Sequence, residues 1–316
     1  MIGYQAFADM TQSSDSNERG HAAHLAALAY LDHRGPADEH AALYAALISF
    51  LDDPSVKVRA ALAYGLLHSS EAPRPIILSL LRDSPIISRA VLQYSPVLVD
   101  ADLAPIVARG DLAMLMAIAQ RARISPRIGA ALLARCDHAT KLGLLRRDDI
   151  AFAAEVLEAL ATADGHDAPI RGALLARKDL PATARMLLVQ RVTESLRECR
   201  LVKGSLASDR LTRVLRDGTD TAISAIGEKS ATDPDFVGKL VGSDQINTRL
   251  LLHAVVTGHV MFFSVCLAAL ADVPREKVFT LLENGSRSAL NALFQRCGLD
   301  TGIASILTQI VLHART

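Results

Sequence analysis

The chain has 316 residues, of which 50% are hydrophobic and only 4% aromatic, and it contains no tryptophan. A chain of this length can bury a sizeable core. Its abundant Ala and Leu favour helices over the β-branched and aromatic surfaces that sheets need. The 34 basic and 34 acidic side chains cancel, so no net charge recruits nucleic acid or an anionic membrane. We therefore expect an all-α protein.

Residues 1–18 are polar, and we expect a flexible N-terminal tail there. This stretch shows no basic region followed by an apolar run, so no signal peptide is predicted and a cytoplasmic location is expected. The four cysteines are far apart and form no C-x-x-C pair. That usage is typical of small buried side chains in a reducing compartment.

Histidines gather near the start of the first predicted repeat. His21 and His24 lie one helical turn apart, and His40 follows with acidic residues close by in the sequence. Such side chains could supply nitrogen and oxygen ligands for a zinc-like site. The polar outer face of a terminal repeat explains the same residues, because nothing covers that face. We favour the second interpretation, so no metal or other cofactor is predicted.

The stretch DDPSVKVRAALAYGLL, residues 52–67, predicts a helix that is apolar on two faces. Asp53 and Pro54 predict its start, as the N-cap and the first helical position. The preceding AALYAALISFL predicts a second helix, separated from the first by about two residues. A helix that is apolar on two faces must be sandwiched between others, so we expect stacked antiparallel helix pairs.

The string DPSVKVRAALAYGLL resembles the second helix of a HEAT-type repeat. Its Asp-x5-Arg spacing returns at a 30-residue offset in RDSPIISRAVLQ, and again in ARKDLPATARMLL. The resemblance implies an aspartate–arginine ladder between adjacent repeats. Alternatively, the arginines line a concave face and hold a carboxylate or phosphate of a partner. We favour the ladder, because half-buried arginines need an internal acid. Its candidate residues are Asp53, Arg59, Asp83, Arg89, Asp179 and Arg185.

Three junctions, ARGD at 108–111, ARCD at 134–137 and ARKD at 176–179, are each expected to end one helix and cap the next. Together these patterns predict an α-solenoid of HEAT/armadillo-like antiparallel helix pairs. Typical helix and loop lengths suggest about 14 to 17 helices.

The segment 121–147 holds seven basic residues and one acidic residue. If several of the basic side chains share one face, they form a site for an acidic protein, a nucleotide or nucleic acid. Separate solvated side chains are the alternative, which we favour because no aromatic residue is present there to stack on bases. The candidates are Arg121, Arg123, Arg127, Arg135, Lys141, Arg146 and Arg147.

The residues TADGHDAPIRG, 162–172, predict the main internal boundary. We expect N-terminal HEAT-like repeats over 19–165 and continuous C-terminal helical repeats over 166–316. The apolar stretch 250–271 is long enough to cross a bilayer, but a break at Thr257 and Gly258 favours two short helices and no membrane span. Gly298 and Asp300 predict a helix end and the next N-cap.

Three further strings, LQYSPVLVDADL (92–103), AIAQRARIS (117–125) and LADVPREKVFTLL (270–282), resemble an uncharacterised, mainly alphaproteobacterial family. That family carries a domain of unknown function with HEAT-like helical repeats. The resemblance implies the fold and assigns no catalytic residue.

Motifs for phosphate cradles, zinc proteases and nucleophile elbows are absent from the sequence. We therefore expect a non-enzymatic scaffold that binds a protein partner along an extended surface. The alternative is a nucleic-acid-binding HEAT-like protein that uses residues 121–147. A buried acid–base site at His253 and His259 would indicate an enzyme, although buried histidines with internal partners are the simpler interpretation. The sequence leaves the oligomeric state open.

Overall fold

The computed structural model describes residue 10, residues 12–242 and residues 246–315, and these residues form 20 α-helices and no strand. The all-α prediction is therefore confirmed, although short turns divide the chain into more helices than expected. The chain separates into two compact units, unit 1 ending at Phe152 and unit 2 beginning at Ala153. Residues 162–172 lie inside unit 2, where they comprise the end of one helix, a turn over 165–167 and the start of the next helix.

Unit 1 contains nine helices among its described residues. They are α2 (Ser16–Asp32), α3 (Ala37–Leu51), α4 (Val56–Leu66), α5 (Arg74–Leu80), α6 (Pro85–Tyr94), α7 (Asp100–Arg109), α8 (Leu112–Ala119), α9 (Pro126–Leu133) and α10 (His138–Leu145).

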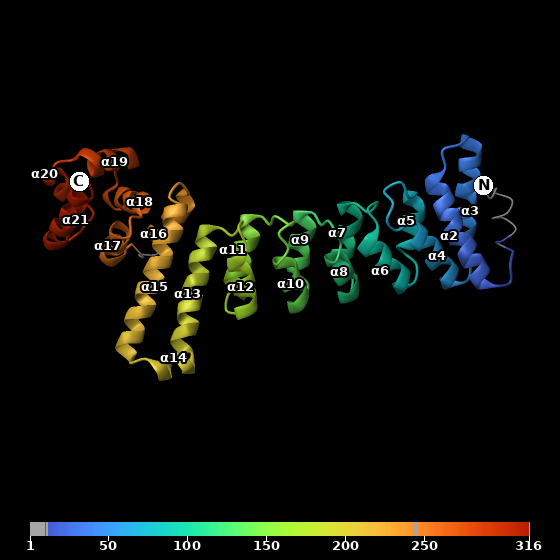
Figure 1. The fold of residues 1–316 in the computed structure, drawn as a ribbon, viewed down its shortest axis with the longest axis horizontal. Coiled ribbons are helices and arrows are strands. Elements are labelled where there is room, and N and C mark those ends of the chain that lie inside the picture. The colour runs from blue at the N-terminus through green and yellow to red at the C-terminus, as the bar shows by residue number, and fades with distance from the viewer. Residues whose placement is uncertain (1–9, 11, 243–245, 316) are drawn as a thin grey trace. The chain divides into compact units, whose positions relative to one another are not determined.

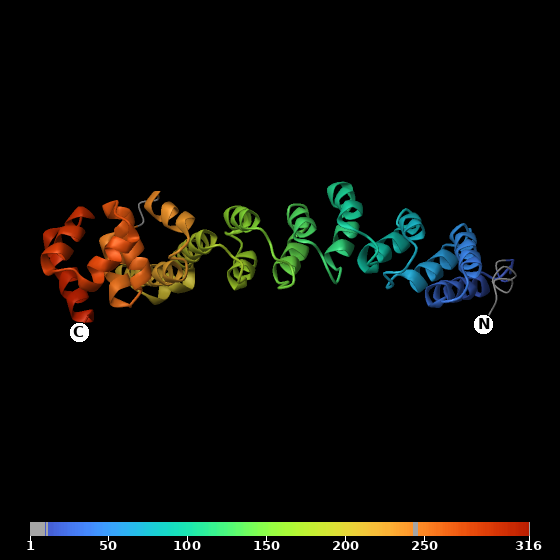
Figure 2. The ribbon, with the colours of Figure 1, turned by 90° about the horizontal axis from the view of Figure 1, so that it is seen from above.

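Consecutive helices of unit 1 pack against each other from α2 to α6 and again from α7 to α10, and most helices also pack against the helix two places further on. The second kind of contact joins α2 to α4, α4 to α6, α6 to α8 and α8 to α10, and likewise α3 to α5 and α7 to α9. The helices of this unit follow one another in chain order (Figures 1 and 2). Neighbouring pairs therefore cover one another's apolar faces, as the pattern of residues 52–67 predicted.

Unit 2 contains the remaining helices. They are α11 (Ala154–Asp164), α12 (Ala168–Ala176), α13 (Ala182–Glu198), α14 (Arg200–Ser205), α15 (Ser208–Lys229), α16 (Pro234–Gly242), α17 (Thr248–Val256), α18 (Val260–Ala271), α19 (Arg275–Asn284), α20 (Arg287–Arg296) and α21 (Thr301–Ala314).

The apolar stretch 250–271 lies in the core of unit 2 as two helices, as predicted. Gly258 separates α17 from α18 with φ +79°, a left-handed conformation that favours glycine. Phe262 and Phe263 are buried against Phe236 and Phe294. Within the described ranges, no helix is both long and apolar enough to cross a bilayer.

Two predicted helix boundaries have different outcomes. Gly298 does adopt a positive φ after α20, and the Asp300 side chain caps α21 at the Gly302 N–H. By contrast, α4 begins at Val56 rather than at Pro54. The Asp53 carboxylate accepts a hydrogen bond from the Ser55 N–H, 2.8 Å away, and closes a turn before the helix.

The close approach of α2 and α4 depends on a glycine. A Cβ atom at Gly65 would lie 2.6 Å from the Cβ of Ala27, whereas a Cβ at Gly143 in α10 would meet no atom within 4 Å. We expect Gly65→Ala to lower the free energy of unfolding by about 1–3 kcal/mol through overpacking.

The matched control, Gly143→Ala, should leave that free energy unchanged or raise it by up to about 1 kcal/mol. Urea denaturation of the two variants measures the difference. Equal effects would show that α2 and α4 do not approach closely at Gly65.

Candidate functional site

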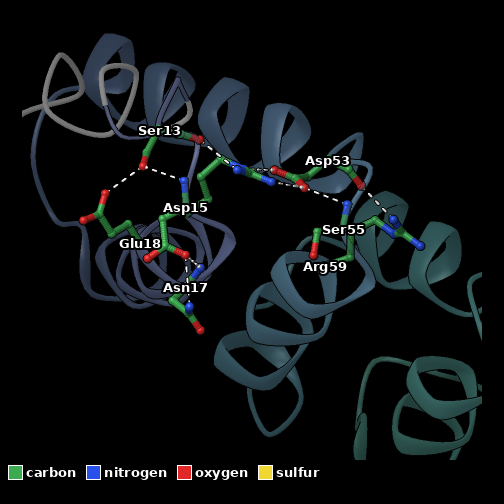
Figure 3. A network of polar contacts seen from close by, with 8 residues as sticks. Ser13, Asp15, Asn17, Glu18, Asp53, Ser55 and Arg59 are labelled. Carbon is green, nitrogen blue, oxygen red and sulfur yellow. Dashed lines mark hydrogen bonds and ion pairs between the residues drawn. The ribbon is translucent and has the colours of Figure 1, made fainter.

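Two ion pairs link the N-terminal ends of α2, α4 and α6. Arg19 in the first turn of α2 places Nε 2.7 Å from Oδ2 of Asp53. Arg59, at the same position in α4, places Nε 2.7 Å from Oδ2 of Asp83, just before α6. Arg59 also donates a hydrogen bond to the Asp53 carbonyl, which Figure 3 shows as a dashed line. The pairs therefore continue from helix to helix.

These pairs are largely buried, and their carboxyl groups are held in the charged form. The exposed fraction of the side chain is 8% for Asp53 and 10% for Asp83. The hydrogen bond from Arg19 lowers the pKa of Asp53, and the bond from Arg59 lowers the pKa of Asp83. The acceptors of the Arg59 guanidinium, the Asp83 carboxylate and the Asp53 carbonyl, both lie inside the fold, and 18% of the Arg59 side chain is exposed.

The other predicted members of the ladder have different partners. Arg89 donates to the Pro85 carbonyl of its own helix, at 2.8 Å. Asp179 pairs with Arg177, with Nη2 and Oδ2 2.7 Å apart, and Arg185 donates to the carbonyl oxygens of residues 175 and 177. The Asp-x5-Arg spacing occurs at three places, and the first two aspartates, Asp53 and Asp83, pair with an arginine of a neighbouring helix.

Arginines from the basic segment cap helix C-termini inside unit 1. Arg121 follows α8 and donates to the Leu92 and Ser95 carbonyls at the end of α6. Arg135 follows α9 and donates to the end of α7, at the carbonyl oxygens of residues 107 and 110. Arg147 follows α10 and reaches the end of α8, at the carbonyl oxygens of residues 119 and 121. Each arginine caps the helix two places before it.

The same arrangement recurs in unit 2. Arg296 at the end of α20 donates to the Ala271 carbonyl of α18 at 2.7 Å. Arg315 after α21 donates to the Leu282 carbonyl of α19 at 2.6 Å. The last carbonyl groups of a helix lack partners within it, and a cation is favoured near that end of the helix dipole. We call Arg121, Arg135, Arg147, Arg296 and Arg315 the arginine caps.

Three of the seven basic residues that were predicted to bind an anion, Arg121, Arg135 and Arg147, are arginine caps. Arg121 is buried, with 8% of its surface exposed, and it points into the fold. Arg123, Arg127 and Arg146 are exposed, and none of them has a hydrogen-bond or ion-pair partner in the described part of the chain. Lys141 is half-buried. The anion-binding prediction therefore now rests mainly on the three exposed arginines.

An open hollow of about 580 Å³, which we call the aromatic groove, is lined by α2 and the C-terminal end of α4. His24 and Leu28 line it from α2, opposite Tyr64 of α4 and the adjacent His68. The Tyr64 ring lies 5.5 Å from that of His24, and the Tyr94 ring extends the row at 5.2 Å from His68. Tyr64 is 67% exposed and Tyr94 49% exposed.

The sequence reasoning missed these tyrosines, although a signal was present. Tyr64 and Tyr94 have the 30-residue offset that also separates Asp53 from Asp83. Residues at equal repeat positions lie side by side when repeats stack. The aromatic row could therefore have been predicted with the ladder.

The N-terminal histidines make ring contacts. His40 stacks on Tyr30 with ring centroids 4.4 Å apart and on His33 at 5.6 Å. His21 is exposed, and His24 lies against Tyr64. Among the residues that the structure places, no three His, Cys, Asp or Glu side chains are grouped to hold a metal ion.

A polar cluster lies between α15 and α17 in unit 2. Asp220 is 7% exposed and pairs with Arg249, with Oδ2 and Nη2 2.6 Å apart. Burial raises the pKa of Asp220. One turn further on, the Ser224 hydroxyl lies 3.0 Å from Nδ1 of His259. Ser224 is fully buried, so a substrate could not reach this hydroxyl.

Two of the cysteines, Cys266 and Cys297, are also unsuited to nucleophilic chemistry. Burial raises the pKa of Cys266 to about 12 and that of Cys297 to about 11. A thiol attacks as the thiolate, and these two thiols stay protonated at neutral pH.

The capping role of Arg121 predicts that its substitution lowers the free energy of unfolding more than substitution of the exposed Arg123. We expect Arg121→Met to lower the free energy of unfolding by about 1–3 kcal/mol, because it leaves the Leu92 and Ser95 carbonyls without a donor. Arg123→Met should change that free energy by less than about 0.5 kcal/mol, because the side chain is exposed. Urea denaturation measures both, and equal losses would contradict the capping role.

Comparison with known proteins adds a family to this description. Neither a curated protein nor a solved structure matches the chain. Residues 87–316, most of the chain, match a family described as an uncharacterised protein conserved in bacteria, DUF2336. The matched region begins in α6 and includes all of unit 2. The chain therefore belongs to this bacterial family, DUF2336.

Proposed function

We propose that this protein is a non-enzymatic scaffold, an α-solenoid of HEAT-like helix pairs, that binds a protein partner through the aromatic groove of unit 1. The contacts between helices two places apart support the repeat architecture. The alphaproteobacterial origin suggested by the sequence remains a prediction.

The exposed tyrosines are the observation that carries this proposal. Tyr64 and Tyr94 leave much of their ring surface uncovered, and Leu28 is 40% exposed beside them. Tyrosine is among the residues that contribute most to protein interfaces. A hollow lined by rings and leucine suits an apolar or aromatic side chain of a partner, and the flanking histidines can add hydrogen bonds.

Two alternative functions have weaker support. Nucleic-acid binding would need a continuous basic groove, but Arg121, Arg135 and Arg147 donate to carbonyl groups within the fold. An acid–base enzyme would need reactive groups open to substrate, and Ser224 is fully buried beside His259.

A capture experiment tests the proposal. The full-length protein, immobilised, is exposed to a lysate of its own bacterium, and the bound partner is identified and purified. Its affinity is then measured for the wild type and for Tyr64→Ala combined with Tyr94→Ala. We expect the double variant to bind at least tenfold more weakly, since each buried hot-spot ring contributes about 2 kcal/mol or more.

The control is Ile86→Ala, which removes a 65% exposed side chain at the other end of the helix that carries Tyr94. The partner should bind this variant with unchanged affinity. Equal binding of the partner to the wild type and the double tyrosine variant would contradict the assignment of the groove.

A further inference from the structure

The long hairpin of unit 2 has a free end. Helices α13 and α15 run side by side, and the short α14 joins them at one end (Figure 1). Along α13 the last buried residue is Leu188, and along α15 burial resumes at Asp220 after the single buried Leu211. Between Leu188 and Asp220 the two helices therefore bury one side chain, that of Leu211, and they contact each other, for example through the hydrogen bond between Thr193 and Thr219, 2.8 Å long.

The free end carries exposed apolar side chains, which is unusual for a surface that stays in water. Leu201 in α14 is 82% exposed, Val214 of α15 is 53% exposed and Leu196 of α13 is 41% exposed. Leu201 is the most exposed of the large hydrophobic side chains recorded in the described chain. We call residues 196–216 the hairpin tip.

The hairpin tip is also basic. It holds only two acidic residues, Glu198 and Asp209. All its basic side chains are exposed, and they are Arg197, Arg200, Lys203, Arg210, Arg213 and Arg216.

The arginines of the tip differ from those of the helix ends. The arginine caps, like Arg19 and Arg59, have acceptors inside the fold. At the tip, Arg197, Arg200 and Arg213 have no hydrogen-bond or ion-pair partner among the described side chains, and they lie close in sequence to Leu196, Leu201 and Val214. Their charge is available to an external anion.

We propose that the hairpin tip is a docking site for the surface of an anionic lipid bilayer. A protruding end with apolar side chains among basic ones matches the interfacial region, where apolar groups enter the acyl boundary and Lys and Arg remain at the anionic headgroups. A bilayer accepts a convex end without a complementary cavity. Nucleic acid fits less well, because the tip has no aromatic side chain for bases to stack on.

This site is separate from the aromatic groove, which lies in unit 1, and it goes beyond the proposed function. The balanced charge of the whole chain gave no indication of it, because the basic tip is offset by acidic residues elsewhere.

Vesicle sedimentation with the full-length protein tests the proposal. The vesicles are phosphatidylcholine alone, or equal parts of phosphatidylcholine and phosphatidylglycerol. We expect binding to the mixed vesicles that weakens as salt is added, and little binding to phosphatidylcholine alone.

Two variants of the tip locate the binding. Arg200→Gln combined with Lys203→Gln should weaken binding to mixed vesicles about 25-fold, at roughly fivefold per basic side chain. Leu201→Ser should weaken it roughly tenfold, by removing one buried apolar side chain. These side chains are exposed, so helix content and the thermal midpoint should match the wild type, and both are measured by circular dichroism.

The matched control is Arg82→Gln combined with Arg109→Gln, which removes two exposed arginines of unit 1 that lie outside the predicted anion site, and it should bind as the wild type does. Failure of the wild type to bind mixed vesicles would overturn the proposal. Equal weakening by the control pair would also overturn it, since the attraction would then be unspecific. So would variants of the tip that bind mixed vesicles as tightly as the wild type does. The double variant Tyr64→Ala and Tyr94→Ala should still bind vesicles. The result of the vesicle experiment is therefore independent of the result of the capture experiment on the aromatic groove.

Discussion

The C-terminal carbonyl groups of short helices are the constraint on which this structure depends. A helix of eight to ten residues leaves its last four carbonyl groups without partners, so a chain of such helices has many acceptors to satisfy. Here an arginine that follows the helix two places further along supplies the donors, as Arg121, Arg135 and Arg147 show in succession. Each contact also fixes the position of one pair relative to the next, because a guanidinium group is planar and presents several donors in a fixed geometry.

At the start of unit 1, two ion pairs likewise fix the position of one helix pair relative to the next. Arg19 and Arg59 reach aspartates that precede the helix two places further on. Charged donors and acceptors therefore connect the same helices that share apolar faces, so polar and apolar contacts specify one packing. Such agreement between polar and apolar contacts is expected of a sequence with a single folded state.

Much of the fold could be predicted from local patterns, whereas the partners of individual arginines could not. The apolar faces of residues 52–67 indicated stacked pairs, and Gly258 indicated the division of 250–271 into two helices. The spacing around Arg89 suggested a ladder that the structure does not contain there, because a one-dimensional spacing does not show which carbonyl or carboxylate faces the side chain. Arg121 illustrates the converse, since its burial under the end of α6 depends on the register of stacking.

The 30-residue offset could have placed Tyr64 and Tyr94 in one row, but neither their exposure nor the hairpin tip follows from sequence spacing. Tyr64 and Tyr94 look like ordinary members of apolar helices until stacking leaves one side of them uncovered. The basic residues of 196–216 form a group only because the chain reverses at α14. Sequence composition gave more weight to residues 121–147, where three of the arginines instead cap helices.

A double-mutant cycle on Arg59 and Asp83 tests most directly whether charged contacts connect helices two places apart. The free energy of unfolding in urea is measured at pH 7 for the wild type, Arg59→Met, Asp83→Ala and the double variant. A coupling energy of about 1–3 kcal/mol between the two sites is predicted. Additive losses, within about 0.5 kcal/mol, would contradict the account.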